Sequence, residues 1–160
     1  MQRYVAGLAF LGKTQEVLLV RKRVPLWQEN LLNAVGGKIE DGETPGQAMA
    51  REFREETGVE VEEGRLSCFC VESRVDYEVH FFKASLTTNE ANLTHPINDV
   101  KEMLIWCHTY EVLRGSDLED CNCVGNLLWL IPMAMDWRDF QARLTVRDNI
   151  SERPTWPCAA

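Results

Sequence analysis

Residues 36–59 constrain the fold most, because this stretch joins a glycine pair to a segment dense in glutamate. It reads GGKIEDGETPGQAMAREFREETGV. If residues 45–57 form a helix, Glu52, Glu55 and Glu56 lie three and four positions apart and share one face. Like charges on one face destabilise an isolated helix, whereas a hard divalent cation with oxygen ligands would reverse that effect.

Residues at both ends of this segment predict where the helix begins and ends. Thr44 is a suitable N-cap, and Gln47 at the third helical position completes a capping-box pattern. Pro45 suits the first turn, and Gly58 is a typical C-terminal glycine. Asp41-Gly42 indicates a turn before the helix. We therefore expect a loop–helix–loop unit.

Taken alone, the acidic helix could be solvent-exposed and stabilised by ion pairs such as Arg51–Glu55. The wider spacing favours another interpretation. The stretch matches the pattern G-x5-E-x7-R-E-U-x-E-E-x-G-U, in which U is a bulky apolar residue, and so it is identified as a member of the Nudix hydrolase family. The matching residues form the sequence box of this family, and they are Gly37, Glu43, Arg51, Glu52, Phe53, Glu55, Glu56, Gly58 and Val59.

The resemblance implies an α/β sandwich in which helices cover both faces of a mixed β-sheet. It also implies metal-dependent hydrolysis of a nucleoside diphosphate linked to another group, with Mg²⁺ or alternatively Mn²⁺ as cofactor. Glu52, Glu55 and Glu56 are the implied metal ligands, together with the carbonyl oxygen of Gly36. Metal ions of this kind neutralise phosphate charge and lower the pKa of bound water.

Other residues take roles around this metal site by the same resemblance. Arg51 is expected to orient a box glutamate, and Glu43 to support the ligands. A further acidic residue, Asp99 or Glu102, would contribute from the segment before Trp106. One glutamate not fully occupied by metal could act as general base, and which one does so stays open.

The substrate prediction depends on residues 18–59, which are similar to 8-oxo-dGTP diphosphatases. Those enzymes share an asparagine before the glycine pair, as at Asn33, and an aromatic residue in the preceding loop, as at Trp27. An acidic pair near the last helix in one such enzyme corresponds here to Asn126 and Leu127. We therefore expect a nucleoside triphosphate pyrophosphohydrolase, acting on ordinary or oxidised nucleotides and releasing a monophosphate and pyrophosphate. The expected substrate-binding residues are Arg21, Arg23, Trp27, Asn33, Gly37, Lys38 and Asn126.

Several alternatives remain open at this point. The basic run at residues 21–23 is either a solvated strand end or a cationic rim for phosphates. Tyr77, eighteen residues past the box, would suit a dinucleoside polyphosphate hydrolase. ADP-ribose hydrolases have a proline near residues 72–75, where this chain has none. A non-catalytic nucleotide sensor would show a broken box, which is not the case here.

Composition limits the class of protein. The 160 residues are 45% hydrophobic and 26% charged, which suits one globular domain over residues 1–148 with a tail over 149–160. The net charge of −8 argues against nucleic acid or an acidic membrane as partner. The two C-x-C pairs lack zinc spacing, so free thiols are expected. We expect a cytoplasmic protein, and a homodimer is an alternative to a monomer.

Hydrophobic patterning predicts the remaining elements. Residues 87–100 are polar and predict a loop. Strands are expected at residues 4–11, 16–20, 31–35, 66–71, 77–86, 103–107 and 140–146, and helices near 110–113 and over 123–135.

Overall fold

The computed structural model describes residues 1–12, 15–23, 26, 29–95, 103–114, 123–136 and 141–145. These residues form an eight-stranded sheet in the order β3-β2-β1-β6-β5-β8, with β4 paired to β1 and β7 paired to β2. The β1–β6 and β5–β8 pairs are parallel, and the other pairs are antiparallel. The predicted α/β fold with a mixed sheet is confirmed.

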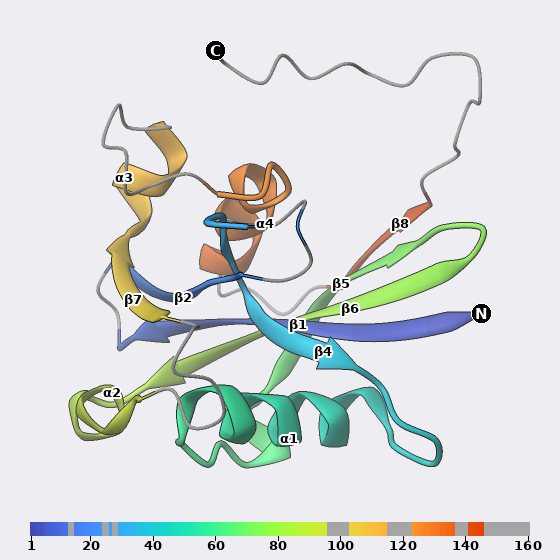
Figure 1. Ribbon diagram of the computed structural model, residues 1–160, viewed down its shortest axis with the longest axis horizontal. Coiled ribbons are helices and arrows are strands. Elements are labelled where there is room, and N and C mark those ends of the chain that lie inside the picture. The colour runs from blue at the N-terminus through green and yellow to red at the C-terminus, as the bar shows by residue number, and fades with distance from the viewer. Residues whose placement is uncertain are drawn as a thin grey trace.

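Figure 1 shows the elements of the chain. The strands are β1 (Gln2–Leu11), β2 (Glu16–Arg21), β3 (Leu32–Asn33), β4 (Val35–Lys38), β5 (Ser67–Ser73), β6 (Tyr77–Leu86), β7 (Met103–His108) and β8 (Ala142–Thr145). The helices are α1 (Pro45–Thr57), the 3-10 helix η2 (Glu63–Arg65), α2 (Thr88–Leu93), α3 (Thr109–Arg114) and α4 (Leu127–Met135).

Two hydrophobic clusters lie on opposite faces of the sheet. Helix α1 buries Ala48, Met49 and Phe53 against one face, and α4 covers the other, as Figure 1 shows. Side chains alternate between the faces along a strand. In β2, Leu18 accordingly belongs to the α1 cluster, whereas Leu19 belongs to the α4 cluster.

The glycine pair lies inside β4, which pairs antiparallel with β1. A Cβ added at Gly36 would lie 2.8 Å from Ala6 Cα and would overlap the carbonyl oxygen of Val5. Glycine is therefore needed for the close approach of the two backbones. This pairing carries the chain from the middle of the sheet to the start of α1.

Three sequence-based assignments need correction. Residues 88–93, predicted as loop, form α2, because Thr87 and Glu90 make a second capping box. The expected strand over 31–35 is two strands, since β3 pairs with β2 and β4 pairs with β1. Helix α4 begins at Leu127 rather than 123, because Cys123 bridges to Leu32 instead.

The four described cysteines, Cys68, Cys70, Cys107 and Cys123, form no disulfide with one another. Burial raises the pKa of Cys70 to about 11, so this thiol stays protonated near neutral pH. No described helix has the length and apolarity needed to cross a membrane. The boundary between residues 1–148 and the tail lies outside the described residues, and this division stays a prediction.

Candidate functional site

Helix α1 begins and ends where its capping residues predicted. Thr44 Oγ1 accepts from the Gln47 backbone N–H at 3.1 Å, and Gln47 Oε1 accepts from the Thr44 N–H at 3.0 Å. At the other end Gly58 is left-handed with φ 77°, and its N–H donates to the carbonyl of Arg54. A good N-cap contributes about 1 kcal/mol. These caps set the first and last residues of the helix that carries the acidic face.

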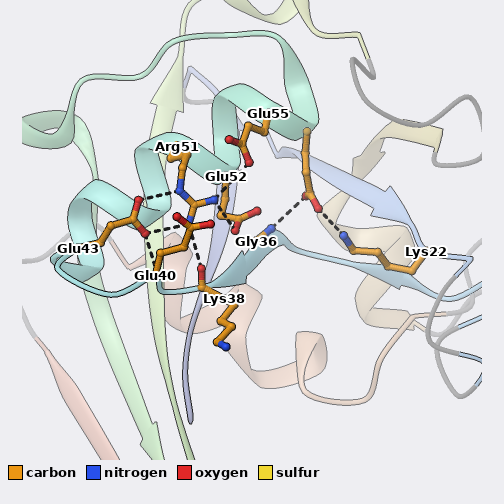
Figure 2. Close-up of polar contacts among 9 residues, drawn as sticks. Lys22, Gly36, Lys38, Glu40, Glu43, Arg51, Glu52 and Glu55 are labelled. Carbon is orange, nitrogen blue, oxygen red and sulfur yellow. Dashed lines mark hydrogen bonds and ion pairs between the residues drawn. The ribbon is translucent and has the colours of Figure 1, made fainter.

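Arg51 is the centre of the polar contacts on this face (Figure 2). Its Nε and Nη2 donate to the two carboxylate oxygens of Glu43 at 2.7 and 2.9 Å. Nη2 also donates to the Lys38 carbonyl at 2.9 Å. Nη1 donates to Glu52 Oε1 at 2.8 Å and to Glu55 Oε2 at 3.2 Å. One guanidinium therefore holds three box glutamates and the end of β4 together.

These contacts change the acidity of the groups involved. The Arg51 hydrogen bonds lower the pKa of Glu43 from 4.5 to about 2, and the same pair raises the pKa of Arg51. Glu52 behaves differently, because its burial raises its pKa more than Arg51 lowers it. Glu43 is thus a fixed anion, whereas the Glu52 carboxylate lies where a negative charge needs a nearby cation.

Gly37 leaves the space that the Glu52 carboxylate occupies. A Cβ added at Gly37 would lie 2.5 Å from Glu52 Cδ, far inside ordinary contact distance. The carboxylate therefore packs directly on the β4 backbone, and the glycine at this position is required for its location.

Glu56 points away from Arg51 and contacts a different cation. Its Oε1 lies 2.5 Å from Lys22 Nζ, and its Oε2 accepts from the Gly36 N–H at 3.1 Å. The side chains of Lys22 and Glu56 are 11% and 16% exposed, so the pair is largely shielded from water. In Figure 2, Lys22 lies on the side of Gly36 away from Arg51.

The cluster keeps a formal negative charge after these pairings. Its four carboxylates, Glu43, Glu52, Glu55 and Glu56, face two cationic side chains, Arg51 and Lys22, which leaves two negative charges. A divalent cation would neutralise that remainder, and carboxylate oxygens suit Mg²⁺.

As they lie in the structure, the side chains of this cluster are not arranged as the ligands of a metal ion. Within the described residues, no three acidic, histidine or cysteine side chains are arranged to hold a metal ion. Arg51 and Lys22 occupy the carboxylates instead. The donor chemistry fits the metal, so Glu52, Glu55, Glu56 and the Gly36 carbonyl stay the predicted ligands.

The expected base-binding residues lie near the junction of β3 and α4. Asn33 Oδ1 accepts from the Ala34 N–H at 2.8 Å. The Val124 N–H donates to the Leu32 carbonyl at 3.0 Å, which brings the start of α4 beside β3. At that start, Asn126 Oδ1 is buried and has no hydrogen-bond partner within the described part of the chain. A buried acceptor without a partner costs about 1–3 kcal/mol.

The other predicted residues are placed as follows. Arg21 is partly buried in β2, in register with Leu32 of β3 and Met103 of β7. Arg23 and Lys38 are exposed. Trp27, Asp99 and Glu102 lie outside the described residues.

Lys22 is the site residue that the sequence analysis missed. The sequence-based interpretation takes residues 21–23 as one unit, either a solvated strand end or a cationic rim, although strand alternation separates its members. Lys22 follows Leu18 by four residues and so faces α1, whereas Arg21 follows Leu19 by two and faces α4. That alternation was visible in the sequence and would have directed Lys22 towards the acidic helix.

Comparison with known proteins identifies similar chains. The NUDIX domain family model matches residues 1–120. The 8-oxo-dGTP diphosphatase of Escherichia coli (strain K12) is 42% identical over 48 residues, which cover 30% of this chain and 37% of that protein. A Bacillus subtilis (strain 168) protein named "Putative 8-oxo-dGTP diphosphatase" is 34% identical over 87 residues, covering 54% of this chain and 55% of that one. The matches thus span about two fifths and about half of these relatives' lengths.

Solved structures share the fold. The MutT protein from Bacillus halodurans superposes with a TM-score of 0.66 at 19% identity, covering 92% of both chains. A NUDIX-family hydrolase from Clostridium perfringens gives a TM-score of 0.64 at 21% identity, covering 86% of this chain and 98% of that one. At such identities the likeness concerns the arrangement of helices and strands.

Proposed function

The chain belongs to the NUDIX domain family, and we propose that it is a divalent-metal-dependent nucleoside triphosphate pyrophosphohydrolase. The observation that carries this proposal is the acidic face of α1. The side chains of Glu52 and Glu56 are only 14% and 16% exposed, and the four carboxylates of this cluster face two cationic side chains. Such a cluster attracts a divalent ion and, through it, a polyphosphate.

The chain's own residues would divide the work of hydrolysis. Glu52, Glu55, Glu56 and the Gly36 carbonyl would hold Mg²⁺ or Mn²⁺, which supplies charge neutralisation at the phosphates and a lowered pKa of bound water. Arg51, clamped by Glu43, holds the ligand carboxylates in position. One of these glutamates, not fully occupied by the metal, would accept the proton of the attacking water. Monophosphate and pyrophosphate are the products.

Base recognition is assigned to Asn33 and Asn126. The buried Oδ1 of Asn126 supports this assignment, because a purine N–H would provide the donor that the described chain does not. The Asn33 amide lies at the edge of β3, to which the segment before Asn126 is hydrogen-bonded. Two asparagines can each donate and accept, which suits a base edge that presents both kinds of group.

The names of the two relatives, both of which specify 8-oxo-dGTP, support an oxidised nucleoside triphosphate as substrate. Tyr77, on which a dinucleoside polyphosphate alternative depends, packs against Tyr4 with ring centroids 6.3 Å apart and lies beneath Arg74. These contacts give Tyr77 a packing role at the start of β6 and add no support for that alternative. The homodimer stays a prediction.

A substrate panel tests the proposed function. The purified protein is given canonical and 8-oxo deoxynucleoside triphosphates, ADP-ribose and diadenosine tetraphosphate, each with Mg²⁺ and with Mn²⁺, and the products are separated. We expect triphosphates to be cleaved to monophosphate and pyrophosphate. Release of orthophosphate, or cleavage restricted to ADP-ribose or the dinucleotide, would contradict the proposal. Nucleotide binding without turnover at millimolar Mg²⁺ would instead favour the sensor.

A further inference from the structure

The backbone at Lys22 is fixed by the hairpin that joins β2 to β3. The Lys22 N–H donates to the Leu31 carbonyl at 3.1 Å, and its carbonyl accepts from the Asn30 N–H at 2.9 Å. Asn30 has a positive φ of 63°, which turns the chain back at this point. The side chain therefore starts from a rigid position on the α1 face of the sheet, and its direction is set by the fold.

From that position the ammonium meets Glu56 and engages one of its carboxylate oxygens. Lys22 Nζ lies 2.5 Å from Glu56 Oε1, and the Gly36 N–H donates to Oε2 at 3.1 Å. Both carboxylate oxygens of Glu56, a predicted metal ligand, thus have hydrogen-bond donors. A divalent cation and an ammonium group cannot share Oε1 closely, because like charges in a shielded site repel strongly.

The two cations of the cluster differ in how firmly they are held. Arg51 is clamped by both oxygens of Glu43 and by the Lys38 carbonyl. Its planar guanidinium can remain there while Glu52 turns towards a metal. Lys22 has a compact charge on a flexible four-carbon stem, so its ammonium can move while its backbone stays in place.

We propose that Lys22 is a displaceable internal cation that occupies Glu56 in the metal-free protein and so sets the affinity for the divalent ion. This role rests on the proposed function, because Glu56 must be a metal ligand. Loading the metal breaks the Lys22–Glu56 pair, and the metal affinity is lower than the carboxylates alone would give. The pair also gives the largely shielded Glu56 carboxylate a cationic partner before loading.

The test measures Mn²⁺ binding by calorimetry in the absence of nucleotide. Lys22→Met and Lys22→Gln remove the ammonium, and Lys22→Arg keeps a positive charge. Lys38→Met is the matched control, because it removes an exposed lysine that contacts Arg51 through its backbone carbonyl. We expect Lys22→Met and Lys22→Gln to bind Mn²⁺ at least about tenfold more tightly than the wild type. Lys22→Arg and Lys38→Met should stay within about threefold of the wild type.

A second readout is thermal stability, which tests the same role without calorimetry. In EDTA, Lys22→Met should unfold at a lower temperature than the wild type, because Glu56 loses its partner. Added Mg²⁺ should then raise the Tm of Lys22→Met more than that of the wild type, since tighter binding stabilises the folded state more.

The outcomes separate this role from the metal assignment on which it depends. If Glu56→Gln weakens Mn²⁺ binding but neither Lys22→Met nor Lys22→Gln tightens it, the displaceable-cation role is overturned and the metal site stands. Weaker binding by both lysine variants would also overturn it, because Lys22 would then assist the metal. If Glu56→Gln binds Mn²⁺ like the wild type, the metal assignment fails and the role of Lys22 fails with it.

Discussion

Replacing Glu43 by glutamine should destabilise the protein by an amount that depends on pH. Glu43 accepts from Arg51 Nε and Nη2 at 2.7 and 2.9 Å, and the two side chains are 20% and 19% exposed. The Arg51 hydrogen bonds lower the Glu43 pKa from 4.5 to about 2, a difference that corresponds to about 3 kcal/mol at full strength. Solvent screening of a partly exposed pair reduces this to about 1–2 kcal/mol.

The sign of the pH dependence follows from the lowered pKa. A carboxylate with a depressed pKa in the folded state contributes its full stability above the unfolded pKa and loses it as the pH falls towards the folded pKa. For Glu43 the window runs from 4.5 down to about 2. At pH 7 the variant should therefore unfold about 2–8 °C below the wild type, and this gap should close towards the bottom of the window.

Urea denaturation in EDTA at several pH values between 7 and 3 measures the corresponding gap in the free energy of unfolding without interference from metal. Glu40→Gln is the matched control, because Glu40 is an exposed carboxylate in the same loop and contacts Glu43 through its backbone N–H. The control should unfold like the wild type at every pH. A Glu43→Gln gap that is absent at pH 7, or that stays constant as the pH falls, would refute the ion-pair reasoning.

Two further predictions concern the residues around the carboxylates. Gly37→Ala should leave the Tm nearly unchanged, because the atoms nearest to its Cβ belong to the movable Glu52 side chain. It should lower turnover, because it displaces the Glu52 carboxylate. Gly36→Ala should instead lower the Tm strongly, because its Cβ meets the backbone of β1. Equal effects of the two substitutions on Tm would contradict this distinction. Asn33→Ala should change the ranking of nucleotide substrates more than the dependence on metal concentration. An unchanged ranking in the substrate panel would exclude contact with the base.

The sequence predicted α1 well because local chemistry defines it. Thr44, Gln47 and Gly58 cap the helix through contacts within a few residues, and the family spacing fixes which glutamates share a face. The same reasoning could have found α2, since Thr87 and Glu90 form the same capping box. Helix α2 is only six residues long and polar, so hydrophobic periodicity gave no indication of it.

The pairing of strands was less accessible, because it depends on contacts distant in sequence. Residues 31–35 look like one apolar strand, yet β3 and β4 pair with different neighbours. Nothing local to Ala34 indicates that exchange of partner. The extension of the strand through Gly36 and Gly37 likewise depends on the close approach of β1.

In the candidate site, the box predicted which residues gather but not which cation holds each of them. Arg51 and Glu43 are eight positions apart, and their two-point contact requires the turn at Asp41-Gly42 that brings the loop back to the helix. Lys22 and Glu56 are 34 positions apart and are brought together only by the tertiary fold. Strand alternation indicates the face of the sheet on which Lys22 lies, but its contact with Glu56 follows only from the fold.

The most direct test of the central claim is pyrophosphate release from a deoxynucleoside triphosphate by the wild type, Glu52→Gln and Glu56→Gln, each with Mg²⁺ and with EDTA. If the acidic face of α1 is a metal-dependent hydrolase site, the wild type should release pyrophosphate in Mg²⁺ and none in EDTA. Both variants should keep their circular dichroism spectrum and lose at least about a hundredfold in kcat. Near-normal kcat in both variants, or release that EDTA does not affect, would contradict it.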